Sequence, residues 1–113
     1  MAADCEADVP LEIGHVLFMD VVGYSKLLIN EQRELQQQLS QIVRDTEPFR
    51  TAETAGKLIR LPVGDGMALV FFNSPEAPVL CALETSKALK ENSRIQLRMG
   101  IHSGPVNQVR DVK

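Results

Sequence analysis

The sequence has no long apolar run and no excess of basic residues. No stretch approaches the ~20 apolar residues of a membrane-spanning helix, so membrane contact is not expected from this segment. The N-terminus is acidic and lacks the apolar core of a secretory signal. The net charge of −3 gives no sign of the basic surface that binds nucleic acids, so a nucleic-acid partner is not expected either.

The chain also has only two cysteines. Cys5 falls in a polar N-terminal segment and Cys81 in a predicted helix, which is not the pattern of a disulfide framework. A reducing compartment is therefore expected, and we predict a cytoplasmic location.

What is present is an ordinary globular composition. The 113 residues are 44% hydrophobic and 24% charged, which is enough for one domain with its own core. Residues 1–12 are mostly small or acidic and show no helical or strand periodicity of apolar residues, so they are predicted to be a disordered leader. The domain is then expected to span residues 13–113, without internal repeats.

The first predicted element is a buried strand that ends on an aspartate. Four apolar residues precede Asp20, which predicts a strand over residues 15–20. Gly23 permits a sharp turn, and Ser25 is placed to cap a helix over residues 25–46. A helix N-terminus presents free N–H groups, so this turn suits an anion such as phosphate. The nearby carboxylate suits a divalent cation that bridges to the phosphate.

A hairpin is predicted in the middle of the chain. Pro48 is expected to end the first helix, and a loop follows as far as Gly56. Two runs of β-formers, residues 57–63 and 67–72, then flank a Gly-Asp-Gly turn centred on Asp65. Such a turn between two β-forming runs is a strong hairpin signal.

A second helix and a last strand complete the domain. Ser74 is placed as an N-cap and Pro75 suits the first helical position, and the helix fades near Asn92. Its buried stripe is predicted to contain Val79, Leu80, Leu83 and Leu89. The last strand is expected over residues 95–102.

The resulting βαββαβ order predicts a ferredoxin-like α+β fold, an antiparallel sheet with two helices on one face. The first and third strands are the usual central pair of that arrangement. The end of the first strand and the hairpin turn then meet at one edge of the sheet. Asp20 and Asp65 are therefore predicted to be neighbours. A divalent ion would relieve the repulsion between their carboxylates.

At these residues the chain resembles the class III adenylate and guanylate cyclase catalytic domain. Three stretches carry the resemblance, in the order of the family: Phe18-Met-Asp20-Val-Val-Gly23-Tyr24-Ser25, Val63-Gly64-Asp65-Gly66-Met-Ala-Leu-Val-Phe71 and Arg98-Met-Gly100-Ile-His102-Ser-Gly104-Pro105. They look like the first metal motif, the second metal motif and the strand that follows. The resemblance spans roughly residues 16–106, and the three stretches together make a specific match.

The resemblance implies a two-metal site. Asp20 and Asp65 would be the catalytic carboxylates, and with the backbone carbonyl of Val21 they would hold two Mg2+ or Mn2+ ions. Attack of the ribose 3′-oxygen on the α-phosphate would release pyrophosphate. The triphosphate of ATP or GTP would be bound by the backbone amides of Val22, Gly23, Tyr24 and Ser25, with the hydroxyl of Ser25 in addition.

The chain departs from the family at two points. Leu61 stands where the family carries a base-reading lysine, and the adjacent Arg60 would point to the opposite face of its strand. Domains of the family also continue beyond the matched part, with an asparagine and an arginine that act on the partner's site. Residues 13–113 are thus expected to be a partial, truncated cyclase domain, inactive alone and active in a full-length homodimer or with a related cyclase domain.

Two other interpretations remain. A non-catalytic cyclase-homology module, which binds a nucleotide or assembles subunits in signalling, is favoured by Leu61. A diguanylate-cyclase-like domain or a polymerase palm shares this layout of carboxylates. The Gly-Asp-Gly turn argues against the former, which has a Gly-Gly-acid-acid-Phe turn, and a palm needs large appended domains.

Overall fold

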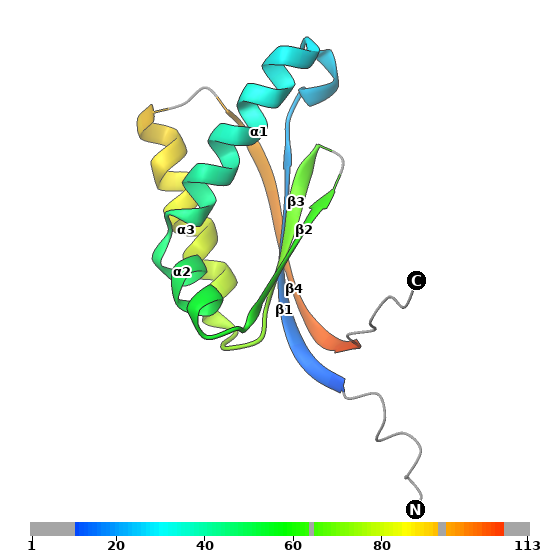
Figure 1. Cartoon of the computed structure of the whole chain (residues 1–113), viewed down its shortest axis with the longest axis vertical. Coiled ribbons are helices and arrows are strands. Elements are labelled where there is room, and N and C mark those ends of the chain that lie inside the picture. Colours follow the sequence, from blue (N-terminus) through cyan, green and yellow to red (C-terminus); the bar gives the residue numbers. More distant parts are fainter. Residues whose placement is uncertain (1–10, 64, 93–94, 108–113) are drawn as a thin grey trace, which may run out of the picture.

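The computed structural model describes residues 11–63, 65–92 and 95–107 (Figure 1). In chain order its elements are β1 (Leu11–Val21), the 3-10 turn η2 (Tyr24–Lys26), α1 (Ile29–Arg44), α2 (Glu47–Thr54), β2 (Leu58–Val63), β3 (Gly66–Phe71), α3 (Glu76–Asn92) and β4 (Leu97–Asn107). None of the helices in these ranges is long and apolar enough to span a bilayer.

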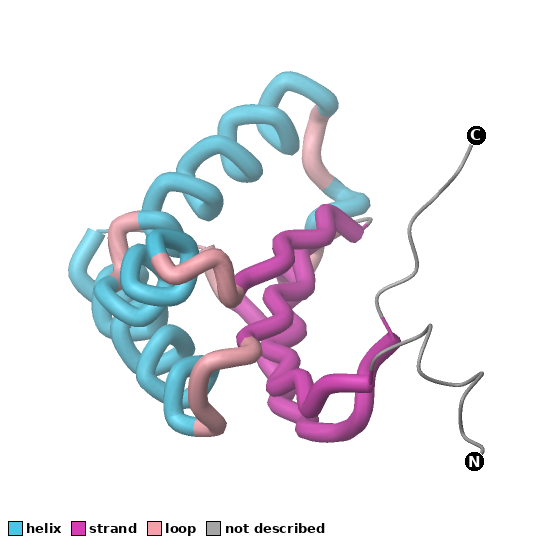
Figure 2. Tube along the Cα trace, turned by 60° about the horizontal axis from the view of Figure 1, so that its bottom comes forward, coloured by secondary structure: helices cyan, strands magenta, loops and turns pink. Residues whose placement is uncertain are grey.

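The strands form one antiparallel sheet in the order β2-β3-β1-β4. All the helices lie on one side of this sheet, and no described element covers its other face (Figures 1 and 2). The predicted ferredoxin-like α+β fold is therefore confirmed. Within the described residues, the covered face carries three α-helices rather than the two that the sequence predicts.

The core lies between the sheet and the helices. Successive residues of a strand point to opposite faces, and alternate residues of β1 face the helices. Leu17, Met19 and Val21 are accordingly at most 2% exposed. Residues of β3 and of all three helices complete the buried cluster: Met67, Leu69, Phe71, Leu39, Val43, Phe49, Ala52, Ala77 and Cys81. The opposite face of β1, which carries Asp20, is left open.

The helix predicted for residues 25–46 is interrupted in the structure. After η2 the chain is extended at Leu28 (ψ 156°), and α1 begins only at Ile29. The N–H of Leu28 donates to the Glu31 side chain at 3.0 Å, which closes the first turn of α1. The prediction that Ser25 caps this helix is wrong, because the extended residue separates Ser25 from the helical turns.

The largest departure from the predicted elements is α2. The sequence predicts a loop from Pro48 to Gly56, yet α2 occupies most of it. Pro48 lies in the first turn of α2, where the N–H that proline lacks would have no partner in any case. It therefore starts a helix instead of only ending one. The new helix buries Phe49 and Ala52 in the core.

The first and last strands of the chain, β1 and β4, are longer than predicted. β1 begins at Leu11 instead of residue 15, and β4 runs to Asn107 instead of ending at residue 102. The two strands pair along their whole length of 11 residues, and each extension supplies backbone partners for the other. The last two residues of the predicted leader are thus in the sheet, while residues 1–10 lie outside the described part of the chain.

The buried stripe predicted for α3 is wrong except at Leu89, which is 6% exposed. The exposed members are Val79, Leu80 and Leu83, at 43%, 48% and 62%. The buried face instead carries smaller residues four positions apart, which are Ala77, Cys81 and Thr85. These small side chains face α2 and β1, on which α3 packs. The start of α3 is as predicted, since the Ser74 hydroxyl accepts from the Ala77 N–H at 3.2 Å.

Cys81 belongs to a small polar cluster inside the helix layer. Its sulfur lies 3.5 Å from the hydroxyl of Thr46, which donates to the Val43 carbonyl at 2.8 Å. Burial raises the pKa of the Cys81 thiol, so the thiol is neutral and fills space as a small apolar group.

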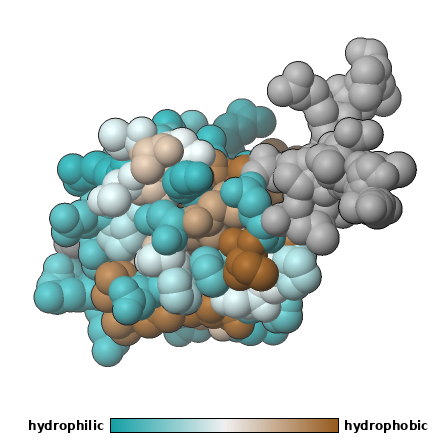
Figure 3. Space-filling view, turned by 90° about the horizontal axis from the view of Figure 1, so that it is seen from below, coloured by the Kyte–Doolittle hydropathy of each residue, from teal (hydrophilic) through white to brown (hydrophobic). Residues whose placement is uncertain are grey.

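Apolar surface also remains outside the core, as patches among polar side chains at the end of the molecule seen in Figure 3.

Two leucine substitutions, one on each face of α3, test which face of this helix is buried. We expect Leu89→Ala to lower the free energy of unfolding by about 2–5 kcal/mol, because it leaves a cavity in a buried site. Leu83→Ala, the same change on the exposed face, should alter it by less than about 0.5 kcal/mol. Urea denaturation of both variants measures the difference. Equal losses would contradict this orientation of the helix.

Candidate functional site

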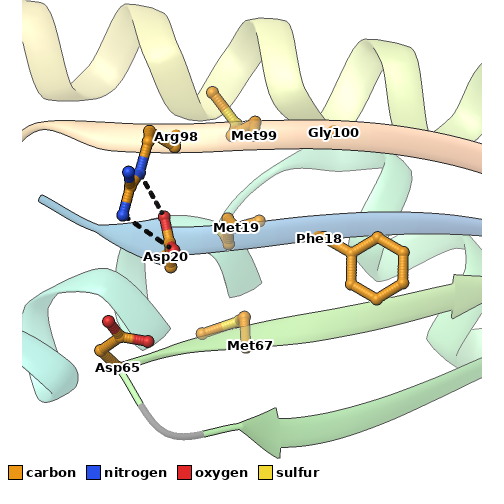
Figure 4. A pocket seen from close by; sticks show the side chains of 8 residues that line it. All are labelled: Phe18, Met19, Asp20, Asp65, Met67, Arg98, Met99 and Gly100. Atoms are coloured by element: carbon orange, nitrogen blue, oxygen red, sulfur yellow. Dashed lines mark hydrogen bonds and ion pairs between the residues drawn. The ribbon is translucent and has the colours of Figure 1, made fainter.

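The two predicted carboxylates come together at one end of the sheet. Asp20 pairs in register with Gly66 at the start of β3, and the Val21 N–H donates to the Asp65 carbonyl oxygen at 3.0 Å. These backbone contacts fix the hairpin turn beside the end of β1. Asp20 and Asp65 consequently line one pocket of about 530 Å³ (Figure 4). The predicted proximity of the two residues is confirmed.

Gly66 makes this close approach possible. A Cβ built on Gly66 would lie 1.9 Å from the Met19 carbonyl oxygen and 2.6 Å from the Cα of Asp20. Both neighbours are backbone atoms of β1 and have little room to move. Only glycine therefore lets the turn that carries Asp65 sit directly against the strand that carries Asp20.

A cationic side chain already lies on Asp20. Arg98 of β4 is in register with Asp20, and its Nε and Nη2 donate to the two carboxylate oxygens at 3.2 and 3.3 Å (Figure 4). The Arg98 side chain is 72% exposed and that of Asp20 is 38% exposed. Arg98 belongs to the third family-like stretch, but the sequence alone indicates no role for it. The antiparallel pairing of the two strands is the signal that would have connected them.

The rest of the pocket is apolar. Its charged groups gather at one end, and the ring of Phe18 lies toward the other (Figure 4). Phe18 is 50% exposed because it points to the open face of the sheet. The remaining lining residues are Met19, Met67, Met99 and Gly100.

Leu61 lies on the same open face. It pairs with Ala68, which in turn pairs with Phe18, so the three side chains form one row across the sheet. Leu61 is 47% exposed. Arg60 pairs with Leu69, whose buried side chain points to the helices, so Arg60 belongs to the other face as the sequence predicts. No charged side chain of β2 therefore replaces the missing lysine on the open face at this position.

The first residues of the turn after β1 lie beside a different pocket from the two carboxylates. Val21 and Val22 line a second pocket, which lies on the helix side between α1 and α3. The Val22 N–H is already used, since it donates to the Gln96 carbonyl oxygen at 2.9 Å. In this conformation it is not free to bind phosphate, and Val21 does not line the pocket of the carboxylates.

The three residues that follow form a tight turn. Gly23 has a φ of 75°, the left-handed conformation that glycine adopts readily, which confirms the predicted sharp turn. The Lys26 N–H donates back to the Gly23 carbonyl at 3.1 Å, so the turn is of the 3-10 type. Tyr24 packs partly against the core, and Ser25 is exposed. Phosphate binding by these residues stays a prediction.

The donor set fits Mg2+ or Mn2+ bound together with a phosphate ligand. The described residues contain no group of three or more His, Cys, Asp or Glu side chains around one point, so a closed all-protein metal site is not formed there. Two carboxylates are nevertheless what Mg2+ commonly takes from a protein when phosphate oxygens and water supply the rest. The guanidinium on Asp20 also shows that a positive charge is accommodated at this carboxylate.

The comparisons with known proteins support the fold. No family model and no curated protein matches the sequence. A solved structure of an adenylate/guanylate cyclase/hydrolase from Silicibacter pomeroyi is similar, with 28% sequence identity and a TM-score of 0.60. The fold of this chain is cyclase-like. The match covers 88% of this chain and 61% of that protein, so the chain spans about three fifths of its length.

The close packing at Gly66 gives a second test. Gly66→Ala should lower the free energy of unfolding by about 1–3 kcal/mol or more, because the added methyl group overlaps the backbone of β1. Gly100→Ala is the matched control on the same pocket, since a Cβ there meets nothing within 4 Å. Thermal unfolding of both variants measures the effect. A Gly66→Ala variant as stable as Gly100→Ala would show that the turn does not approach β1 so closely.

Proposed function

We propose that this chain is the N-terminal part of a class III nucleotidyl cyclase domain, which in a full-length dimer converts ATP or GTP to the 3′,5′-cyclic nucleotide and pyrophosphate. The observation that supports this most is the pocket that Asp20 and Asp65 share, in a fold similar to that of the Silicibacter pomeroyi protein. The two aspartates would together hold two Mg2+ or Mn2+ ions. When bound, such ions would neutralise phosphate charge and align the attacking oxygen.

The two ends of the pocket would bind different parts of the nucleotide. Asp20 and Asp65 offer oxygen ligands at the charged end of the pocket, where the triphosphate would lie. The other end, around Phe18 and the row toward Leu61, offers an apolar surface for the less polar part of the nucleotide. Because Leu61 brings no charge or hydrogen bond, discrimination between adenine and guanine by this position would be weak.

The open face of the sheet supports assembly with a second cyclase domain. Phe18 and Leu61 leave about half of their surface exposed on this face, at 50% and 47%. The pocket opens on the same face, so a partner domain that covers it would also close the site. Exposed apolar side chains beside a functional pocket are typical of such contact surfaces. We expect a homodimer or a pair with a related cyclase domain.

A second function is favoured by specific observations at the same site. The N–H of Val22 is bonded within the protein, and Leu61 replaces the base-reading lysine. A non-catalytic module that binds nucleotide, or that only assembles subunits in signalling, requires neither group. Binding and turnover measurements together distinguish it from a cyclase.

Binding tests the carboxylates. We expect the chain to bind ATP or GTP in the presence of Mn2+, and Asp65→Ala and Asp20→Ala to weaken this by about tenfold or more, because each removes a charged ligand. Asp45→Ala, which removes an exposed aspartate at the end of α1, should bind as the unchanged protein does. Isothermal titration calorimetry measures all three. Binding that survives both pocket variants would rule out the proposed site.

Turnover tests the expected need for a complete dimer. This segment by itself should produce no cyclic nucleotide from ATP or GTP with Mn2+, because the proposed site also needs transition-state groups from a partner. Chromatographic analysis of the nucleotides after prolonged incubation provides the measurement. Cyclic AMP or cyclic GMP formed by the purified segment, and absent with Asp65→Ala, would show that these residues suffice.

A further inference from the structure

The ion pair between Arg98 and Asp20 occupies a carboxylate that the proposed function assigns to a divalent cation. The guanidinium donates bidentate hydrogen bonds to both carboxylate oxygens of Asp20, at 3.2 and 3.3 Å (Figure 4). Asp65, which lines the same pocket, makes no ion pair with any other residue that the structure describes. The two carboxylates of the pocket therefore differ, since one holds a cationic side chain and the other is accessible.

We propose that Arg98 competes with the divalent cation for Asp20, so that a cation completes its site only when it displaces the guanidinium. This inference rests on the proposed function, because it requires a cation at the two aspartates. It adds a positioning role for Arg98, which holds the Asp20 carboxylate in place while no cation is bound. The cation-free protein thus keeps a satisfied ion pair where it would otherwise carry two neighbouring negative charges.

Sharing of the carboxylate between both cations is unfavourable. An ion bound to Asp20 and a guanidinium 3.2 Å from the same oxygen would be only a few ångströms apart. Like charges at such a distance repel strongly even where water is near. The Arg98 side chain is 72% exposed and so has room to swing into solvent. Exposed ion pairs contribute little free energy, so a divalent ion loses little of its binding free energy when it displaces the guanidinium.

The position of Arg98 is set by the sheet and not by chance contact. Asp20 and Arg98 are direct register partners on β1 and β4, so their side chains leave the sheet on the same face. Arg98 therefore returns to Asp20 whenever the cation leaves. A long basic side chain on a neighbouring loop would have no such fixed partner.

Cation affinity measures the competition. Mn2+ titrations of the whole chain, followed by the electron paramagnetic resonance signal of free Mn2+, should show about two- to fivefold tighter binding by Arg98→Ala than by the unchanged protein, which is the range expected for loss of an exposed ion pair. Arg98→Lys should fall between the two, because an ammonium keeps the charge but cannot bridge both oxygens. Arg60→Ala, which removes an exposed positive charge of the other face of the sheet, should bind Mn2+ as the unchanged protein does.

A second readout follows Arg98 directly. The Nε–H resonance of Arg98 should be observable in the cation-free protein and should shift and exchange faster when the diamagnetic ion Mg2+ is added. Equal Mn2+ affinity of Arg98→Ala and the unchanged protein, with an unaltered Arg98 resonance, would overturn the competition and leave the cation site standing. Loss of Mn2+ binding from every variant, with the fold intact by circular dichroism, would overturn the cation site and the competition together.

Discussion

The antiparallel pairing of β1 with both β3 and β4 is the constraint on which the site depends. One residue of β1, Asp20, has Gly66 as its partner on one side and Arg98 on the other. A shift of one residue in either ladder would send a partner to the helix side of the sheet. The register therefore decides both which carboxylate lies beside Asp20 and which cation neutralises it. The missing side chain of Gly66 then sets how closely the hairpin turn approaches.

The sequence predicts the parts of the fold that depend on local chemistry. The strand before Asp20, the hairpin around Asp65 and the serine cap before α3 all appear in the structure. Each rests on a short run of residues whose backbone preferences are strong. The neighbouring position of the two aspartates is also predicted, because the βαββαβ order leaves few arrangements of the central strands.

Tertiary packing decides the features that the sequence does not reveal. Pro48 is compatible both with the end of one helix and with the first turn of the next, and only the buried Phe49 of α2 settles the choice. The buried face of α3 follows from its packing on α2 and β1, so Cys81 and Thr85 are inside while Leu80 and Leu83 are outside. The role of Arg98 was missed because a strand-to-strand register is not visible in a single strand.

The central claim is that a divalent cation binds between the end of β1 and the hairpin turn. Mn2+ broadens the nuclear magnetic resonance signals of nearby nuclei, so a titration of the 15N-labelled chain locates the ion without reference to activity. A cation at this position should remove the amide signals of Asp20, Asp65 and Arg98 first and leave those of α2 unchanged. Selective broadening at another part of the surface, or none at any Mn2+ concentration, would contradict it.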